Sequence, residues 1–359
     1  MKSRVSSLMH RALADGVFPA AELLVARGGV CVHHQHYGAA SAMTIFDLAS
    51  LTKSVVTATR CMQLCQTGRL DLEWPLQRLL GSQAAGSPSA DVTVRQLLMH
   101  TAGCPAWRPF YVALPPHEVG TAVGRRAIER AALMEPPESV PGTVGRYSDV
   151  GFILLGMLLE TIDARPLDVQ FATEIAEPFG MTATTTFRPL SDTATAADTT
   201  HCAPTEDCPW RKQMVQGHVH DQNCYAMGGV AGHAGLFGNA TDLDRFVRAI
   251  RAAWQGDSTW LDPTTVRTFF DRRRIENIPG AHYVCGWDTP SGDHPAAGHH
   301  TSPNTVGHLG FTGCSLWIDL DADWSVILLT NRIHPRVDNV KIQAFRPQLH
   351  DAIINNVLV

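Results

Sequence analysis

The sequence lacks long hydrophobic runs and a strong net charge. Its 359 residues carry a formal net charge of −5, and the pI is near 6.4. Such a balance gives no electrostatic reason to bind nucleic acid or an anionic membrane. The longest clean apolar run, VGFILLGMLLE, is about half of what a membrane-spanning helix needs. We therefore expect no nucleic-acid partner and no membrane span.

A paired cysteine framework and a secretory signal are also missing. The nine cysteines are scattered and odd in number, unlike the frameworks of small secreted proteins. The first residues, MKSRVSSLMHRALADG, mix charged with apolar residues and have no continuous apolar centre. Free thiols and a cytoplasmic location are therefore predicted. Cys202 and Cys208 flank a polar loop and could pair or bind a metal, but no second pair of suitable spacing supports this.

Lysine is scarce, with 4 lysines against 25 arginines. One of them, Lys53, follows Ser50 by three positions in IFDLASLTKSVV, so the two can touch if a helix begins there. A serine hydroxyl becomes a nucleophile when a neighbouring base takes its proton, and a lysine of lowered pKa can be that base. Alternatively, Ser50 caps the helix and Lys53 is solvated. From composition alone, the probability that some lysine follows a serine by three positions is roughly 0.2, so the pair by itself does not identify a catalytic site.

Apolar periodicity predicts strands at both ends of the chain and helices between them. The predicted helices span 3–15, 51–67, 241–254 and 339–357, and the predicted strands span 20–29, 30–38, 282–287, 305–310, 313–320 and 324–331. We expect an α+β fold in which both termini build one antiparallel sheet flanked by helices. Residues 1–68 and 226–359 would form the lobe with the sheet, and residues 69–225 an inserted, mostly helical lobe. A substrate cleft would lie between the lobes.

Two further motifs accompany the serine and lysine. GRYSDVGFILLGMLLE places Tyr147 and Asp149 at the start of an apolar helix, and VGHLGFTGCSLWIDL places His308 and Gly310 before an apolar strand. Taken singly, a packed aromatic and a structural histidine would explain them. In this order, the three motifs resemble those of the penicillin-binding protein and β-lactamase-like superfamily of serine hydrolases. This superfamily includes class C β-lactamases, D-aminopeptidases, D-alanyl-D-alanine carboxypeptidases and related esterases.

The resemblance extends beyond these motifs and implies roles for individual residues. GRLDLEWPLQRLLG, VTVRQLLMHTAG and GGVAGHAGLFGNATDLDRF are similar to family segments in the same order, so the resemblance covers most of residues 15–332. It implies that Ser50 is the acylated nucleophile and that Lys53 shares its proton. Tyr147 would be a general base or acid, its phenolate favoured by Lys53. The backbone N–H groups of Ser50 and Phe311 would form the oxyanion hole.

Two positions depart from the family pattern. Asp149 stands where the family usually has asparagine, and His308, Leu309 and Gly310 stand where it has lysine, threonine and glycine. An ionised Asp149 only accepts hydrogen bonds, so it would hold Lys53 by charge but repel the carbonyl oxygen of an acylamido group. His308 removes a permanent cation and leaves a group that titrates near neutrality. Both departures favour an esterase, or a peptidase with a less acidic substrate, over an efficient β-lactamase or carboxypeptidase.

The sequence thus predicts a carboxylesterase-like serine hydrolase that cleaves a small ester or amide without a cofactor or metal. D-amino-acid peptidase, carboxypeptidase and β-lactamase activities remain alternatives, as does a non-catalytic binding or sensor module, which the intact catalytic residues disfavour. The substrate would be a small ester, amide or peptide, and the sequence indicates no oligomeric state.

The sequence also offers candidates for the lining of the cleft and for a metal site. We expect the cleft to be lined by aromatic residues of the middle lobe, Trp107, Phe110, Tyr111 and Trp210. His218, His220 and Asp221 lack the helical H-x-x-x-H spacing and a matching cysteine set, so we predict no metal site there.

Overall fold

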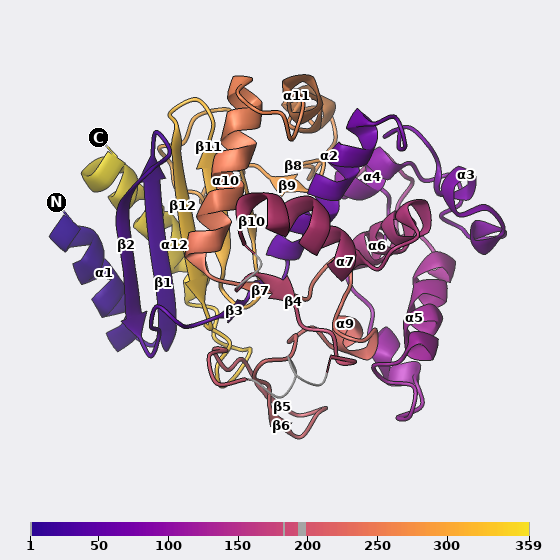
Figure 1. Ribbon diagram of the computed structural model, residues 1–359, viewed down its shortest axis with the longest axis horizontal. Helices are drawn as coiled ribbons and strands as arrows, with labels where there is room; N and C mark the ends of the chain where they lie inside the picture. Colours follow the sequence, from indigo (N-terminus) through magenta and orange to yellow (C-terminus); the bar gives the residue numbers. More distant parts are fainter. Residues whose placement is uncertain (1, 182–183, 193–198, 359) are drawn as a thin grey trace.

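The computed structural model describes residues 2–181, 184–192 and 199–358. Its main sheet has seven strands in the order β2-β1-β12-β11-β10-β9-β8 (Figure 1). All neighbouring pairs are antiparallel. The strands are β1 (Ala20–Arg27), β2 (Val30–Gly38), β8 (Tyr283–Val284), β9 (Trp287–Asp288), β10 (Thr305–Leu309), β11 (Ser315–Asp319) and β12 (Trp324–Thr330). The predicted α+β class, with an antiparallel sheet built from both ends of the chain, is confirmed.

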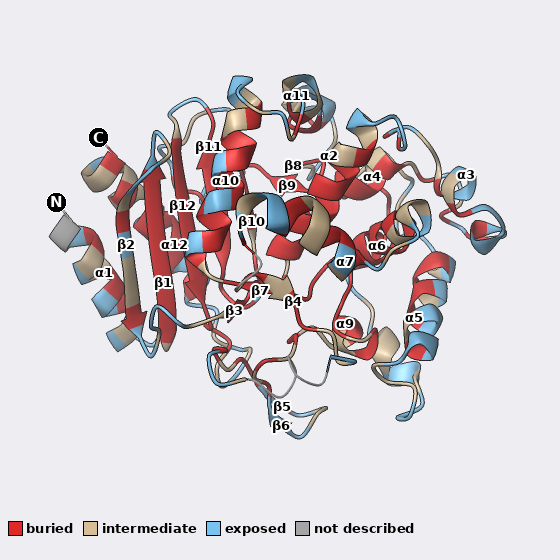
Figure 2. Ribbon diagram, in the orientation of Figure 1, coloured by how far each residue is buried: buried red, intermediate tan, exposed pale blue. Residues whose placement is uncertain are grey.

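Helices cover both faces of this sheet. α1 (Lys2–Ala14) and α12 (Ile342–Ile353) lie on one face, and α10 (Ala240–Gln255) lies on the other (Figure 1). Because side chains alternate along a strand, Leu23 of β1 packs with α1 and α12, whereas Leu24 joins the main core. Figure 2 shows β1 buried along its length, whereas the edge strand β2 is only partly covered.

The rest of the chain is mostly helical and packs beside the sheet. Its central helix, α6 (Asp149–Asp163), contains the apolar run noted above, and residues 150–159 are all buried. The other helices are α2 (Thr59–Gln66), α3 (Leu76–Leu80), α4 (Val94–Leu98), α5 (Ala122–Met134), α7 (Leu167–Phe171), α9 (Gln222–Ala226) and α11 (Pro263–Phe269). Short strands form two small sheets, β3 (Phe46–Asp47) with β7 (Leu236–Gly238) and β4 (Thr186–Phe187), and β5 (Asp207–Cys208) with β6 (Gln213–Met214).

The helix predicted over 51–67 is not regular. Residues Lys53–Ala58 form a π-helical segment that continues into α2. The Ser54 hydroxyl donates to the carbonyl of Gly286 at 2.7 Å, and the Thr57 hydroxyl donates to that of Gly232 at 2.6 Å. These buried bonds tie the segment to two neighbouring loops. Wide turns of this kind occur frequently at functional sites.

Two other elements also differ from their predictions. The single strand expected near 282–287 is two short strands, β8 and β9, because Cys285 and Gly286 take positive φ angles of 37° and 86° and reverse the chain. The last helix begins at Ile342 and ends in a π-helical turn over Ile354–Leu358. The nine cysteines all lie within the described residues, and none of them forms a disulfide. Within the described ranges, no helix has both the length and the apolar character needed to cross a membrane.

Candidate active site

Ser50 lies between β3 and the π-helical segment, in a strained turn. The preceding residue, Ala49, has a φ of 48°, in the left-handed region that residues with a Cβ rarely adopt. The side chain of Asp47 supports this turn by accepting the N–H of Ala49 at 2.9 Å. Ser50 itself lines a cavity whose volume is about 580 Å³. This size is typical of a small-molecule site.

Lys53 is fully buried and contacts Ser50 directly. Its Nζ donates to Ser50 Oγ at 2.9 Å, to Asp149 Oδ1 at 2.6 Å and to the His233 carbonyl at 3.0 Å. All three protons of the ammonium are therefore engaged. Burial lowers the pKa of Lys53 below its ordinary value, and the Asp149 carboxylate opposes this shift. The alternative of a solvated Lys53 is wrong.

Tyr147 contacts Ser50 from the other side. Its hydroxyl donates to Ser50 Oγ at 2.7 Å, and Lys53 Nζ lies 4.8 Å from the centre of its ring. Burial raises the pKa of Tyr147 well above its ordinary value, and the negative charge of Asp149 raises it further. The expectation that Lys53 favours the phenolate form of Tyr147 is therefore wrong for the resting site. There Tyr147 is a neutral hydrogen-bond donor.

Two residues that line the cavity have backbone N–H groups without a hydrogen-bond acceptor in the described chain. Neither the amide of Ser50 nor that of Phe311 donates to another group in the described part of the chain, and both residues line the cavity. Gly310 lets the end of β10 approach the serine turn, because a Cβ there would lie 2.8 Å from the carbonyl oxygen of Leu48. The Thr312 hydroxyl reinforces this contact by donating to the Asp47 carbonyl at 2.8 Å.

His308 lies outside the cavity lining. It is buried, its Nδ1 lies 2.8 Å from the carbonyl oxygen of Leu309, and its ring packs near Tyr147 and Tyr283. Burial and the charge of Lys53 lower the pKa of His308 to about 3. The expectation that His308 titrates near neutrality is therefore wrong, and the side chain is neutral at physiological pH.

The carboxylates that line the cavity are all paired with basic groups. Asp149 lies at 2.6 Å from Lys53, Glu206 at 2.9 Å from His220, and Asp221 at 2.8 Å from His233. The hydrogen bond from His220 lowers the pKa of Glu206. Asp221 also caps α9 by accepting the N–H of Cys224 at 2.7 Å. Each acidic group of the cavity thus has a basic hydrogen-bond partner within the protein.

Two arginines of the cavity, in contrast, have no acidic partner. No carboxylate lies within 4.0 Å of Arg332 or Arg346 among the residues that the structure describes. Arg346, on α12, donates from Nη2 to the carbonyls of Cys314 and Gly310 at 2.8 and 3.3 Å, and its buried Nε has no partner in the described chain. Burial lowers the pKa of Arg346 to about 10, so it remains cationic at neutral pH.

The predicted aromatic lining is mostly wrong. Trp107 lines the cavity, but Phe110, Tyr111 and Trp210 do not. The ring of Tyr111 instead packs between those of Trp107 and Trp210, with centroid distances of 6.3 and 4.5 Å. Tyr283 lines the cavity beside Tyr147 and was missed, since nothing in its local sequence indicates a site.

Neither of the metal-site candidates weighed from the sequence forms a cluster. Cys202 and Cys208 form no disulfide with each other. His218, His220 and Asp221 do not converge on a common point, because His220 bonds Glu206 while Asp221 bonds His233. His220 is therefore the partner of a cavity carboxylate, whereas the ring of His218 packs near that of Tyr225.

Comparison with known proteins decides the family. The Beta-lactamase family model matches residues 5–347 of the chain. The chain belongs to the Beta-lactamase family. As a member of this family it is a serine hydrolase, and the resemblance inferred from the sequence motifs is confirmed.

Curated relatives and solved structures agree with this membership. Proteins of Salmonella paratyphi B and Salmonella newport named "Putative D-alanyl-D-alanine carboxypeptidase" are 31% identical to the chain, over 84% of its length and 73% of theirs. The hydrolase EstCE1, described as having promiscuous acyltransferase activity, is 21% identical with a TM-score of 0.74, and the match covers 98% of each chain. A penicillin-binding protein homologue from Pyrococcus abyssi is 18% identical with a TM-score of 0.73, over 98% of this chain and 77% of that one. These structures share the fold of the family.

Proposed function

We propose that this enzyme hydrolyses small esters or amides through a covalent acyl intermediate on Ser50. One observation carries the proposal: Ser50 Oγ lies within hydrogen-bond distance of both Lys53 Nζ and the Tyr147 hydroxyl, at 2.9 and 2.7 Å. Ser50 and Phe311, whose amides are unengaged in the described chain, line the same cavity. A nucleophile, a base, an acid and two oxyanion donors are the groups that acyl transfer requires.

The contacts of Lys53 suit a general base. In its neutral form, Lys53 keeps two N–H donors for Asp149 and the His233 carbonyl and turns its lone pair toward Ser50. Lys53 then takes the hydroxyl proton as Ser50 Oγ bonds to the substrate carbonyl carbon, and the two backbone amides stabilise the oxyanion. Tyr147 gives its proton to the departing alkoxide or amine, and the proton held by Lys53 restores the phenol. Water attacks the acyl-enzyme by the same steps in reverse.

The Asp149→Asn variant should move the pH dependence of hydrolysis. Because the Asp149 charge holds a proton on Lys53, removing it lowers the pKa of Lys53 further. The neutral base then forms at lower pH, so the rising limb of the kcat/KM profile should shift toward acid. A stopped-flow pH profile with a p-nitrophenyl ester measures this shift. Glu206→Gln, which removes a cavity carboxylate that does not contact Lys53, is the control; a rising limb that stays in place in Asp149→Asn would contradict the role of Lys53.

A second candidate function is the cleavage of D-amino-acid peptides that bear a free carboxylate. The unpaired Arg332 and Arg346 favour it, because a cation without a carboxylate partner in a cavity is positioned to bind an anionic substrate group. These arginines supply the cation that His308 does not. The names of the Salmonella relatives support the same substrate class. So does that of a Streptomyces D-stereospecific amidohydrolase, which is 21% identical with a TM-score of 0.67. This match covers 90% of this chain and 94% of that one.

The two candidate functions predict different effects of the Arg346→Gln variant. If Arg346 binds a substrate carboxylate, the variant should raise KM for a D-alanyl peptide free acid by about 10-fold or more, the loss of a charged hydrogen bond. The peptide amide and a neutral p-nitrophenyl ester should change little. Arg336→Gln, at an exposed arginine outside the cavity, is the control. Equal losses on all three substrates would mean that Arg346 only holds the end of β10 in place and does not bind a substrate carboxylate. If the wild-type enzyme hydrolysed neither esters nor D-peptides nor a chromogenic cephalosporin, the proposed function itself would be contradicted.

A further inference from the structure

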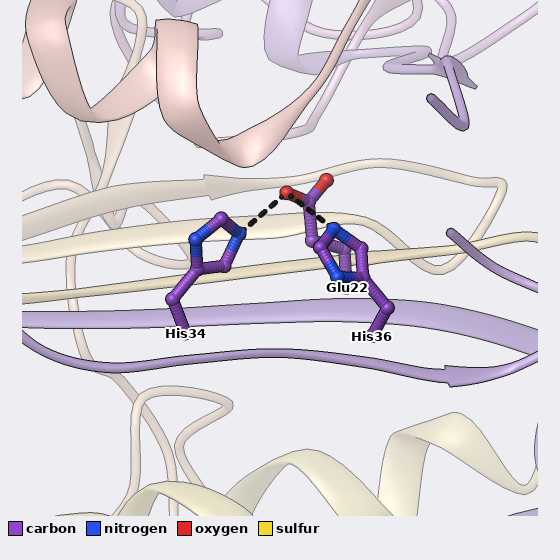
Figure 3. Close-up of side chains that lie close together, drawn as sticks. All are labelled: Glu22, His34 and His36. Atoms are coloured by element: carbon purple, nitrogen blue, oxygen red, sulfur yellow. Dashed lines mark hydrogen bonds and ion pairs between the residues drawn. The ribbon is translucent and has the colours of Figure 1, made fainter. Parts of the chain in front are cut away.

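A second cluster of chemically active side chains lies on the sheet, away from the cavity. Glu22 is on β1, and His34 and His36 are on the neighbouring strand β2, where Glu22 pairs with His36 and Leu24 with His34. Because side chains alternate along a strand, His34 and His36 share one face, which is also the face of Glu22. Figure 3 shows both imidazoles directed at the Glu22 carboxylate.

The three donor atoms converge closely. His34 Nε2 lies 2.8 Å and His36 Nε2 lies 3.4 Å from the same oxygen, Glu22 Oε1, and all three ligand atoms lie within 4.8 Å of one another. Two ligand atoms bound to one tetrahedral zinc ion are about 3.3 Å apart, given metal–ligand bonds of about 2.0–2.1 Å. Small rotations about the soft imidazole torsions would bring the three atoms to that spacing.

The surroundings fix the carboxylate and leave the imidazoles accessible. Glu22 is 2% exposed, and its other oxygen, Oε2, accepts the N–H of Ala240 at the start of α10 at 3.0 Å. The side chains of His34 and His36 are 30% and 25% exposed, since β2 is the edge strand of the sheet. The two imidazoles are therefore partly open to solvent, which could provide a fourth ligand.

The charge of Glu22 is the second indication of a ligand. No lysine or arginine lies within 4.0 Å of this carboxylate among the described residues, and its side-chain partners are the two histidines. A buried carboxylate without a permanent cation is unusual, because burial of an unpaired charge costs free energy. A divalent cation between the carboxylate and the imidazoles would supply the missing charge.

We propose that Glu22, His34 and His36 bind a divalent transition-metal ion of the zinc class, with water as the fourth ligand. Two imidazoles and one carboxylate suit Zn²⁺, whereas Mg²⁺ and Ca²⁺ prefer sites made of oxygen ligands. The ion ties β1 to β2 and, through Glu22 Oε2 and Ala240, to the start of α10, so its role is structural. None of the three residues lines the cavity of Ser50, and the proposal is independent of the hydrolytic one.

Zinc titration of the full-length, chelator-treated protein tests this site. Isothermal calorimetry with Zn²⁺ alone should show one equivalent bound by the wild type, and Tm should rise with the Zn²⁺ concentration, because a ligand that binds the folded state stabilises it. EDTA should reverse the rise. In the His34→Ala/His36→Ala double variant, this binding and the rise in Tm should be lost, whereas His117→Ala, at a histidine whose side chain is 81% exposed, should behave as the wild type.

Glu22→Gln is a second variant that separates binding from folding. The amide oxygen can still accept the N–H of Ala240, but the anionic ligand is gone, so Zn²⁺ affinity should fall at least 10-fold with little change in the metal-free Tm. All variants should hydrolyse a p-nitrophenyl ester at the wild-type rate, since none alters the Ser50 site. Equal Zn²⁺ affinity of the wild type and the double variant, or no binding by the wild type at 100 µM Zn²⁺, would overturn the proposal.

Discussion

Ser50→Ala is expected to lower kcat/KM for a p-nitrophenyl ester by about 10³-fold or more, as the loss of a catalytic nucleophile does in other serine hydrolases. Without the hydroxyl, Lys53 still donates to Asp149 and to the His233 carbonyl, and Tyr147 still lines the cavity. The Tm should therefore stay within a few degrees of the wild-type value. Initial rates, with thermal unfolding on the same samples, measure both quantities.

Ser54→Ala is the matched control for this variant. Ser54 lies four residues further along the same segment, and its buried hydroxyl donates to the Gly286 carbonyl and not to the cavity. Its removal should cost about 1 kcal/mol of stability, the usual worth of one hydrogen bond, and leave most of the activity. If Ser54→Ala and Ser50→Ala lost activity to the same degree, the effect would be one of folding and Ser50 would not be the nucleophile.

Lys53→Met should lower kcat by about 10²–10⁴-fold, the usual contribution of a general base. Methionine fills a similar volume but cannot take the proton of Ser50, so the rising limb of the pH profile should disappear as well. The variant also leaves Asp149 without its partner, which should destabilise the fold by about 3 kcal/mol. Steady-state kinetics and denaturant unfolding are the measurements.

The double variant Lys53→Met/Asp149→Asn separates these two effects. It removes the stranded carboxylate together with the lysine, so most of the lost stability should return, whereas kcat should stay low. A recovery of activity in the double variant would mean that Lys53 acts only by neutralising Asp149 and is not the base.

Much of the fold and part of the candidate site could be predicted from sequence because the signals were local. The strands at both ends of the chain follow from alternating and apolar runs, and the contact of Ser50 with Lys53 follows from their spacing near the start of a helix. The order of the three motifs added Tyr147, which the structure places 2.7 Å from Ser50.

What could not be predicted depends on burial and on contacts between distant segments. The raised pKa of Tyr147 and the lowered pKa of His308 arise from their surroundings, which a local motif does not describe. Arg346 reaches the cavity from the last helix, so nothing in its own sequence marks it. The alternation of His34 and His36 does predict that they share a face, but the opposing Glu22 depends on the register between β1 and β2.

The central claim, an acyl intermediate on Ser50, is tested most directly by intact-mass spectrometry of enzyme quenched in acid during turnover of a p-nitrophenyl ester. The account predicts a single adduct of the acyl group's mass, which peptide mapping places on the segment that contains Ser50 and which is absent from Ser50→Ala. Steady turnover with no adduct on wild-type protein, even with a fluorophosphonate as a trapping probe, or an adduct that maps to another residue, would contradict it.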